Sequence, residues 1–204
     1  MTYVSNEFFT GQPVSLVLGQ PLLRDELVIG GERPQDVAAR ERLLDDAFGA
    51  ARFQKTCERL REGRLPAAGL SLSAHVDGEL AGTIRFWHIE AGDRPALLLG
   101  PVAVDERHRS LGIGRKLIVE GLFRAMQRGH KAVLLVGDAP YYNRFGFERS
   151  ATRGLALPGP VDEARFLGLE LAPGALEGAR GLVRASGACM LHEVFSEDVM
   201  RRAA

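Results

Sequence analysis

Several residue types that mark specialised classes of protein are scarce in this 204-residue sequence. It has two cysteines, Cys57 and Cys189, which lie far apart and outside any CxxC spacing. That excludes a disulfide framework as the basis of the fold and favours a reducing, cytoplasmic location. The five histidines are scattered without an HxxxH pair, so we expect no metal site.

Net charge and long apolar runs are lacking as well. Lys+Arg and Asp+Glu both total 26, giving a formal net charge of zero. We therefore expect no general nucleic-acid binding, which needs excess positive charge to displace counterions from phosphates. The apolar run of residues 14–18 is broken by Gly19, Gln20 and Pro21, and no basic leader precedes it. Neither a signal peptide nor a membrane-spanning segment is expected.

The composition is that of an ordinary globular chain, with 46% hydrophobic and 25% charged residues, and its length suits one domain. Residues 1–26 read as an irregular extension. The pattern then predicts, in order, a strand at 27–29, helices at 34–48 and 52–61, strands at 70–76, 80–89 and 96–104, a helix at 113–127, a strand at 132–136, a short helix at 141–144 and a strand at 166–171. This order predicts an α/β fold, with a mixed sheet and helices on both faces.

Two dipeptides give local detail. Asp77-Gly78 between alternating segments indicates a tight hairpin turn. Gly100-Pro101 interrupts the apolar strand at residues 96–104. Because proline cannot donate to a strand ladder, we expect a β-bulge there that parts this strand from the one at 132–136.

A glycine-containing loop carries the clearest chemical signal. The strand ending at residue 104 leads to the loop Arg109-Ser110-Leu111-Gly112-Ile113-Gly114, which opens directly into a helix. Free N–H groups and the dipole at a helix start favour an anion, and glycine lets it approach. A P-loop string is absent, and a Rossmann fingerprint would need glycine where Leu117 stands. On these features alone, a solvated basic turn fits as well as a pyrophosphate site.

The surrounding motifs make the loop specific. The stretch from Val102 to Gly114 resembles the acetyl-CoA motif of the GCN5-related N-acetyltransferase (GNAT) superfamily, in which V-x-V is followed by [Q/R]-x-x-G-x-[G/A]. The later Y-x-x-x-G-F motif of that superfamily corresponds to residues 142–147. Residues 134–142 and 155–159 are similar to its YhbS-like bacterial branch. The resemblance covers about residues 27–172.

The resemblance implies a GNAT fold whose bulged central strand is splayed to admit CoA. It implies a domain at residues 27–185 and a C-terminal tail at 186–204. The implied activity is direct transfer of an acetyl group from acetyl-CoA to a primary amine in a ternary complex. The residues that the resemblance assigns to cofactor binding are Val102, Ala103, Val104, Arg109, Ser110, Leu111, Gly112, Ile113, Gly114 and Arg115.

The resemblance also names Tyr142 as the acid that protonates the departing thiolate, while its neighbour Tyr141 is expected to pack. The general base is not evident, because residues 96–104 contain no carboxylate. His88 and Glu90 on the preceding strand are candidates, and a water-mediated route is the alternative. Arg85 and Trp87 are assigned either to the acceptor pocket or to packing. Asp138, just before Ala139-Pro140, is expected to cap the short helix.

Two alternatives stay open. The donor could carry a longer acyl chain or be an acyl carrier protein, and the chain could be a CoA-binding regulatory module with little catalysis. The acceptor could be a small-molecule amine or a protein amine. The resemblance leaves a homodimer open as the assembly.

Overall fold

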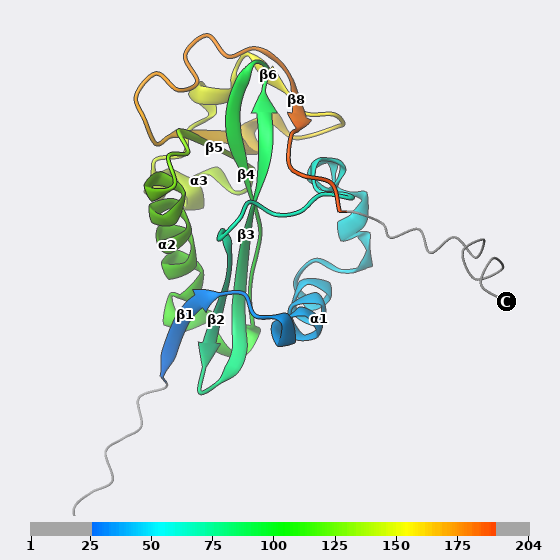
Figure 1. The fold of residues 1–204 in the computed structure, drawn as a ribbon, viewed down its shortest axis with the longest axis vertical. Coiled ribbons are helices and arrows are strands. Elements are labelled where there is room, and N and C mark those ends of the chain that lie inside the picture. The colour runs from blue at the N-terminus through cyan, green and yellow to red at the C-terminus, as the bar shows by residue number, and fades with distance from the viewer. Residues whose placement is uncertain (1–25, 191–204) are drawn as a thin grey trace, which may run out of the picture.

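The computed structural model describes residues 26–190. An open mixed sheet runs in the order β1-β2-β3-β4-β5-β7, with β8 pairing to one end of β3 and β6 pairing to β8 (Figure 1). The strands are β1 Leu27–Gly31, β2 Ser71–Val76, β3 Glu79–Ala91, β4 Arg94–Val104, β5 Ala132–Val136, β6 Leu155–Ala156, β7 Phe166–Glu170 and β8 Gly181–Ala185. The predicted α/β class, with a mixed sheet between helices, is confirmed.

The helices lie on both faces of this sheet. The α-helices are α1 Val37–Phe48, α2 Ile113–Gln127 and α3 Ala139–Tyr142. Short 3-10 segments are η1 Pro34–Asp36, η2 Ala50–Gln54, η3 Thr56–Leu60, η4 Glu106–Leu111, η5 Asn143–Phe145, η6 Arg149–Thr152 and η7 Glu163–Arg165. In Figure 1, α2 covers one side of the central strands and α1 lies on the other.

Alternating side chains of the strands feed two separate apolar layers. On the α2 side, Ile113 and Leu117 pack in one cluster with Ile84 and Phe86 of β3. On the α1 side, Leu43 and Leu44 of α1 pack on Ala103 of β4. Further along that side, η3 contributes Leu60 to a cluster with Trp87 and Leu98. The centre of the sheet is thus fixed by hydrocarbon burial on both faces.

Two predicted backbone features are present. The β2–β3 hairpin turns at Asp77 and Gly78, whose φ angles of 51° and 85° lie in the left-handed region. Such angles at both central residues are the reason for the Asp-Gly preference in two-residue turns. In the β3–β4 ladder, only one residue of β3 separates the pairs Ile84↔Val102 and Phe86↔Leu99, against two of β4. The extra residue confirms the bulge at Gly100–Pro101.

The predicted helix at residues 52–61 is wrong. The chain forms η2 and η3, separated by Lys55 in an extended conformation. Contacts with a distant loop hold η3, since Thr56 Oγ1 donates to Pro160 O at 2.5 Å and Arg59 Nη1 to Pro158 O at 2.7 Å. The short helix predicted at 141–144 begins earlier, at Ala139, and continues as η5. The predicted extension at 1–26 falls almost wholly outside the described residues, as does most of the tail at 186–204.

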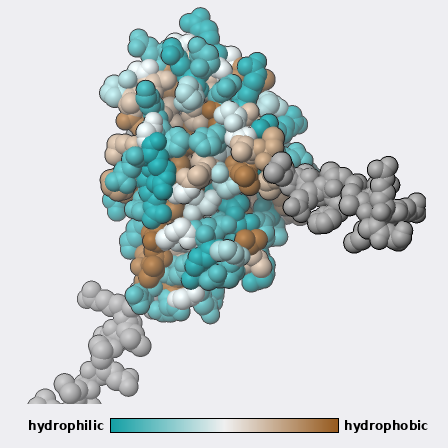
Figure 2. Space-filling model, in the orientation of Figure 1, coloured by the Kyte–Doolittle hydropathy of each residue, from teal (hydrophilic) through white to brown (hydrophobic). Residues whose placement is uncertain are grey.

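The face drawn in Figure 2 is mainly hydrophilic, with apolar side chains in small separate groups. Within residues 26–190, none of the helices has the length and apolar character needed to cross a bilayer.

Candidate active site

The central parallel strands separate at one point. β4 pairs with β5 only at Leu97 and Leu98, although β4 continues to Val104. On its other side, β4 stays paired with β3 as far as Val104. Within the described part of the chain, the edge of β4 that faces β5 therefore has no strand partner beyond Leu98. Its backbone groups can pair with an extended ligand as an added strand would.

The loop after β4 opens into α2 through a glycine. Gly112 has a φ of 68° and is the N-cap of α2. The N–H of Lys116 donates to the Gly112 carbonyl at 3.1 Å, which makes the first turn of the helix. The N–H groups of residues 113–115 precede this bond and have no partner inside the helix. The partial positive charge of the helix dipole falls at the same place.

The cations of this loop have acidic neighbours. Arg109 is 60% exposed and its Nη2 lies 2.9 Å from Glu106 Oε1. Arg107 Nη2 lies 3.0 Å from Asp105 Oδ2, and this hydrogen bond is the main reason that the pKa of Asp105 is lowered. Arg115 is exposed at the first turn of α2. The positive charge of the loop is partly balanced, so its backbone N–H groups are the more specific anion-binding feature.

The tyrosine pair lies on α3, just after β5. Asp138 caps this helix by accepting a hydrogen bond from the Tyr141 N–H at 3.2 Å, as expected. A Cβ built on Gly114 would lie 3.4 Å from Tyr141 Oη, so this hydroxyl reaches the start of α2. The sequence had suggested only packing for Tyr141. A Cβ on Gly137 would come within 2.2 Å of the Tyr142 ring, which shows how closely that ring packs on the end of β5.

The environment of Tyr142 keeps its hydroxyl protonated. Burial raises the pKa of Tyr142 to about 12; the neighbouring Tyr141 adds to the shift and Arg165 opposes it. Its ring packs edge-on against Phe147, with 5.9 Å between the ring centroids. A hydroxyl with this pKa is neutral at pH 7 and can donate a proton or a hydrogen bond.

The structure places the two candidate bases elsewhere. His88 lies opposite Leu97, before the bulge, and its ring centroid is 5.3 Å from that of His130, just beyond the C-terminal end of α2. Gly112 is at the other end of this helix, about 22 Å away for 15 residues at 1.5 Å each. Glu90 is exposed and still farther from the bulge, opposite Pro95. Neither residue is brought together with residues 102–104.

The α1 side of the bulge carries charged and polar side chains. Arg85 Nε and Nη2 donate to the two oxygens of Glu32 at 2.8 and 2.5 Å, and Arg40 of α1 also pairs with Glu32. Trp87 Nε1 donates to the carbonyl of Gly100 at 2.7 Å. Arg85 and Trp87 were candidates for the acceptor pocket, and the structure places both beside the bulge.

Arg61, which follows η3, is a candidate site residue that the sequence motifs do not include. Its Nη2 would lie 3.2 Å from a Cβ at Gly100, so it sits over the bulge. Its Nε is buried and has no hydrogen-bond partner among residues 26–190. Burial lowers the pKa of Arg61. No sequence signal separates this arginine from Arg59 and Arg64 nearby, because its burial arises only from tertiary packing.

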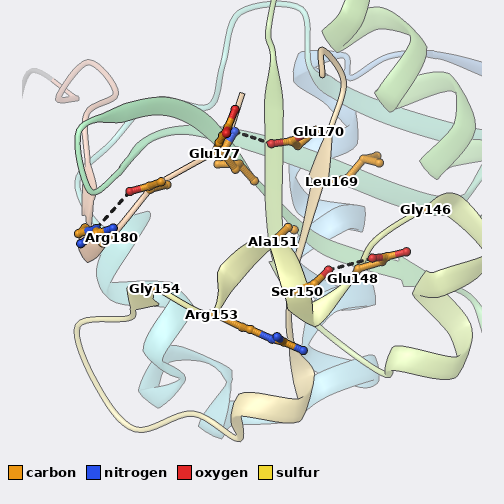
Figure 3. Close-up of a pocket in the computed structure, with 14 residues that line it drawn as sticks. Gly146, Glu148, Ser150, Ala151, Arg153, Gly154, Leu169, Glu170, Glu177 and Arg180 are labelled. Atoms are coloured by element: carbon orange, nitrogen blue, oxygen red, sulfur yellow. Dashed lines mark hydrogen bonds between the residues drawn. The ribbon is translucent and has the colours of Figure 1, made fainter. Parts of the chain in front are cut away.

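A hollow of about 800 Å³, which none of these residues lines, lies between η6 and the chain after β7. Figure 3 shows Glu148 and Ser150 on one side of it and Glu170 on another. Ser150 Oγ donates to Glu148 at 2.8 Å, and Glu170 accepts from the N–H groups of Gly174 and Leu176 at 2.9 and 2.7 Å. These carboxylates brace the surrounding loops.

A mixed sheet with a bulged strand, unpaired along one edge and leading into the open start of a helix, defines the class of acyltransferases that use CoA thioesters. The model of the acetyltransferase (GNAT) family matches residues 38–147. The chain belongs to this family and is an N-acyltransferase. The resemblance seen in its motifs is thereby confirmed.

Relatives agree with this assignment. The chain is 33% identical to the N-acetyltransferase YhbS of Escherichia coli K12 over 159 residues, which are 77% of this chain and 95% of that protein. The crystal structure of E. coli YhbS in complex with CoA has a TM-score of 0.69 and 32% identity, covering 80% of this chain and 91% of that one. A Brucella melitensis GNAT acetyltransferase in complex with acetyl-CoA has a TM-score of 0.57 and 27% identity, covering 85% and 100%.

Proposed function

We propose that this enzyme transfers the acetyl group of acetyl-CoA to a primary amine in the cytoplasm, using a catalytic unit at residues 27–185. The observation that carries this proposal is the edge of β4 beyond Leu98, which has no strand partner among residues 26–190 and runs into the open N-terminus of α2. That edge suits an extended pantetheine arm, and the helix start suits a pyrophosphate. The CoA and acetyl-CoA complexes of the relatives support the choice of donor.

The backbone of β4 and the loop would hold acetyl-CoA. Residues 102–104 offer strand-like pairing, and residues 113–115 offer free N–H groups. Gly114 leaves the helix start open to a phosphate, while Arg109 and Arg115 add positive charge. The set proposed for the cofactor remains Val102, Ala103, Val104, Arg109, Ser110, Leu111, Gly112, Ile113, Gly114 and Arg115.

When bound, acetyl-CoA supplies the thioester carbonyl that the amine attacks. A C–N bond forms and the C–S bond breaks. An N–H of β4 near Val102 donates to the carbonyl oxygen as it gains negative charge. The Tyr142 hydroxyl gives its proton to the leaving sulfur. The amine gives its surplus proton to water, and Tyr142 regains a proton through the same water. Water takes this role because His88 and Glu90 pair with Leu97 and Pro95, several residues from Val102 along β4.

Thermal unfolding with acetyl-CoA tests this proposal. Millimolar acetyl-CoA should raise the melting temperature, because it binds the folded chain only. Thiol release should then depend on an added amine. No shift with a folded protein would contradict the proposal. Binding without thiol release over a broad amine panel would favour the regulatory module, and failure of free CoA to compete would favour a carrier-protein donor.

A further inference from the structure

Buried arginines on the α1 side of the sheet differ in whether an acidic side chain accepts their hydrogen bonds. The side chains of Arg40, Arg52, Arg85 and Arg61 are only 7%, 13%, 16% and 13% exposed. Arg40 and Arg85 share Glu32, and Arg52 Nε lies 2.8 Å from Asp45 while its Nη2 lies 2.5 Å from Glu41. A buried guanidinium needs such partners, because desolvation without them is costly.

Arg61 lacks an equivalent partner within residues 26–190. The nearest ion-pair distance found for it, Nη1 to Glu58 Oε2, is 3.6 Å, which is too long for a hydrogen bond. Its Nε is buried and has no hydrogen-bond partner in the described part of the chain. The half-buried Cys57 is its other polar neighbour, and a neutral thiol does not neutralise a cation. Within residues 26–190, Arg61 therefore presents hydrogen-bond donors without acceptors, and Glu58, 3.6 Å away, is the only carboxylate paired with its charge.

Arg61 lies where its charge can act on a ligand that approaches the bulge. Its guanidinium lies over Gly100, at the bulge in β4. Along the same face, α1 covers Ala103 on one side of the bulge and η3 covers Leu98 on the other. The stretch between them, Pro101 and Val102, is only half-buried. An amine that approaches the bulge from this face passes beside Arg61.

We propose that Arg61 binds a carboxylate of the acceptor, so that the preferred substrate is a small amine carrying a carboxylate a few bonds from its nitrogen, as an amino acid does. This inference rests on the proposed acetyl transfer. A planar guanidinium with free donors matches a carboxylate through paired, charge-assisted hydrogen bonds. We assign this carboxylate to the acceptor and not to the acyl donor. Arg61 lies on the α1 face, whereas the donor is assigned to the edge of β4 that faces β5.

Matched amine pairs test the proposal. The probes are 4-aminobutyrate with butylamine and leucine with leucinamide, each assayed with acetyl-CoA. The wild type should prefer the carboxylate member, and Arg61→Gln should reduce that preference by about 10- to 100-fold. Arg61→Lys should keep part of it. Arg42→Gln removes a charge from an exposed position of α1 and should behave as the wild type.

A binding readout makes the test independent of turnover. Trp87 is the one tryptophan of the sequence, and it bonds to the same Gly100 that Arg61 covers. Sodium butyrate should change its fluorescence saturably in the wild type and not in Arg61→Gln, with sodium chloride as the ionic-strength control. No saturable change in the wild type would overturn the proposal.

Three further outcomes are distinguishable. Equal loss of both members of each amine pair in Arg61→Gln would make Arg61 a structural residue and overturn the inference. If Arg61→Gln lost only the ability to use succinyl-CoA as the donor, the carboxylate bound by Arg61 would belong to the donor, and the inference would again be overturned. Absence of acetyl-CoA binding in all variants, with the butyrate response intact, would instead contradict the proposed acetyl transfer.

Discussion

The two faces of the central sheet differ in how they present charge. On the α2 face, the groups proposed to bind a ligand are mainly backbone groups, from the start of α2 and from the edge of β4 that lacks a strand partner in the described part of the chain. On the α1 face they are side chains: ion pairs around Glu32 and Asp36, and Arg61, whose buried Nε has no hydrogen-bond partner within residues 26–190. Backbone recognition needs a fixed local geometry, whereas side-chain recognition depends on which residues tertiary packing brings together.

This difference separates the general part of the reaction from the specific part. The proposed donor site consists of backbone groups, and it requires little more than a bulge and glycines, whichever amine is the acceptor. Charged side chains on the other face can change without disturbing that site. We therefore expect substitutions on the α2 face to affect donor binding and those on the α1 face to affect acceptor choice and stability.

The largest effect should come from Gly114→Glu. A carboxylate at the start of α2 would face the donor's phosphates, and such like-charge contact costs several kcal/mol, or more than about 100-fold in acetyl-CoA affinity. The fold should survive, since a negative charge favours a helix N-terminus. Titration calorimetry with acetyl-CoA measures the effect.

Gly114→Ala is the matched control. Its Cβ would meet neighbours at ordinary contact distances of 3.4 and 3.5 Å, so binding should change little. Wild-type affinity in Gly114→Glu would show that the phosphates lie elsewhere.

The next effect concerns Tyr142, the proposed proton donor. Tyr142→Phe keeps the ring against Gly137 and removes the hydroxyl. General acids contribute about 10²- to 10⁴-fold, and the thiolate is a good leaving group, so we expect about a 100-fold lower kcat with an unchanged Kd for acetyl-CoA. Because the pKa of Tyr142 is raised to about 12, the wild type should lose no rate through this group between pH 7 and 10. Full kcat in the variant would leave Tyr142 as a packing residue.

Local patterns in the sequence were sufficient for the α2 face. Gly100–Pro101 predicted the bulge, Asp77-Gly78 the hairpin, and the helix at 113–127 agrees with α2 residue for residue. Each of these depends on the conformational limits of a few adjacent residues. That is why a motif in one stretch of chain was enough to indicate the family.

The α1 face depended on distant partners. The helix predicted at 52–61 is divided at the extended Lys55, and its second part, η3, is hydrogen-bonded to the loop at 158–160. In the sequence, Arg61 cannot be distinguished from a surface arginine. Only the packing of the folded chain places it over Gly100. Glu32 likewise forms its ion pair with Arg85, which lies 53 residues away in the sequence. The spacing of residues along the chain does not predict such long-range contacts.

The buried carboxylate of Asp36 on the α1 face should contribute measurably to stability. Asp36 is 3% exposed, accepts from the Arg33 N–H at 2.9 Å and lies 3.1 Å from His75 Nε2. Although burial alone would raise it, the pKa of Asp36 is lowered by its hydrogen bonds to Arg33 and His75. Asp36→Asn should therefore lower the free energy of unfolding by about 3 kcal/mol at pH 7.

The pH dependence of this loss has a defined sign. A carboxyl whose pKa is lower in the folded state contributes fully above its unfolded pKa of about 4, and the contribution fades as pH falls below that. Urea unfolding at pH 7 and pH 3.5 should thus show a smaller gap between wild type and variant at the lower pH. A gap that does not depend on pH would mean that Asp36 acts through packing. Acetyl-CoA affinity should stay unchanged throughout.

The smallest effect should come from Trp87→Phe, which tests whether the two faces are independent. Trp87 is on the α1 side, but its Nε1 donates to Gly100 O in the strand that the donor is proposed to pair with. Losing one buried hydrogen bond should reduce the free energy of unfolding by about 1 kcal/mol, measured by circular dichroism in urea. The Kd for acetyl-CoA should stay within about threefold, because β3 still pairs with residues 102–104. A loss of affinity as large as in Gly114→Glu would show that Trp87 shapes the bulge for both substrates, and that the faces cannot be altered separately.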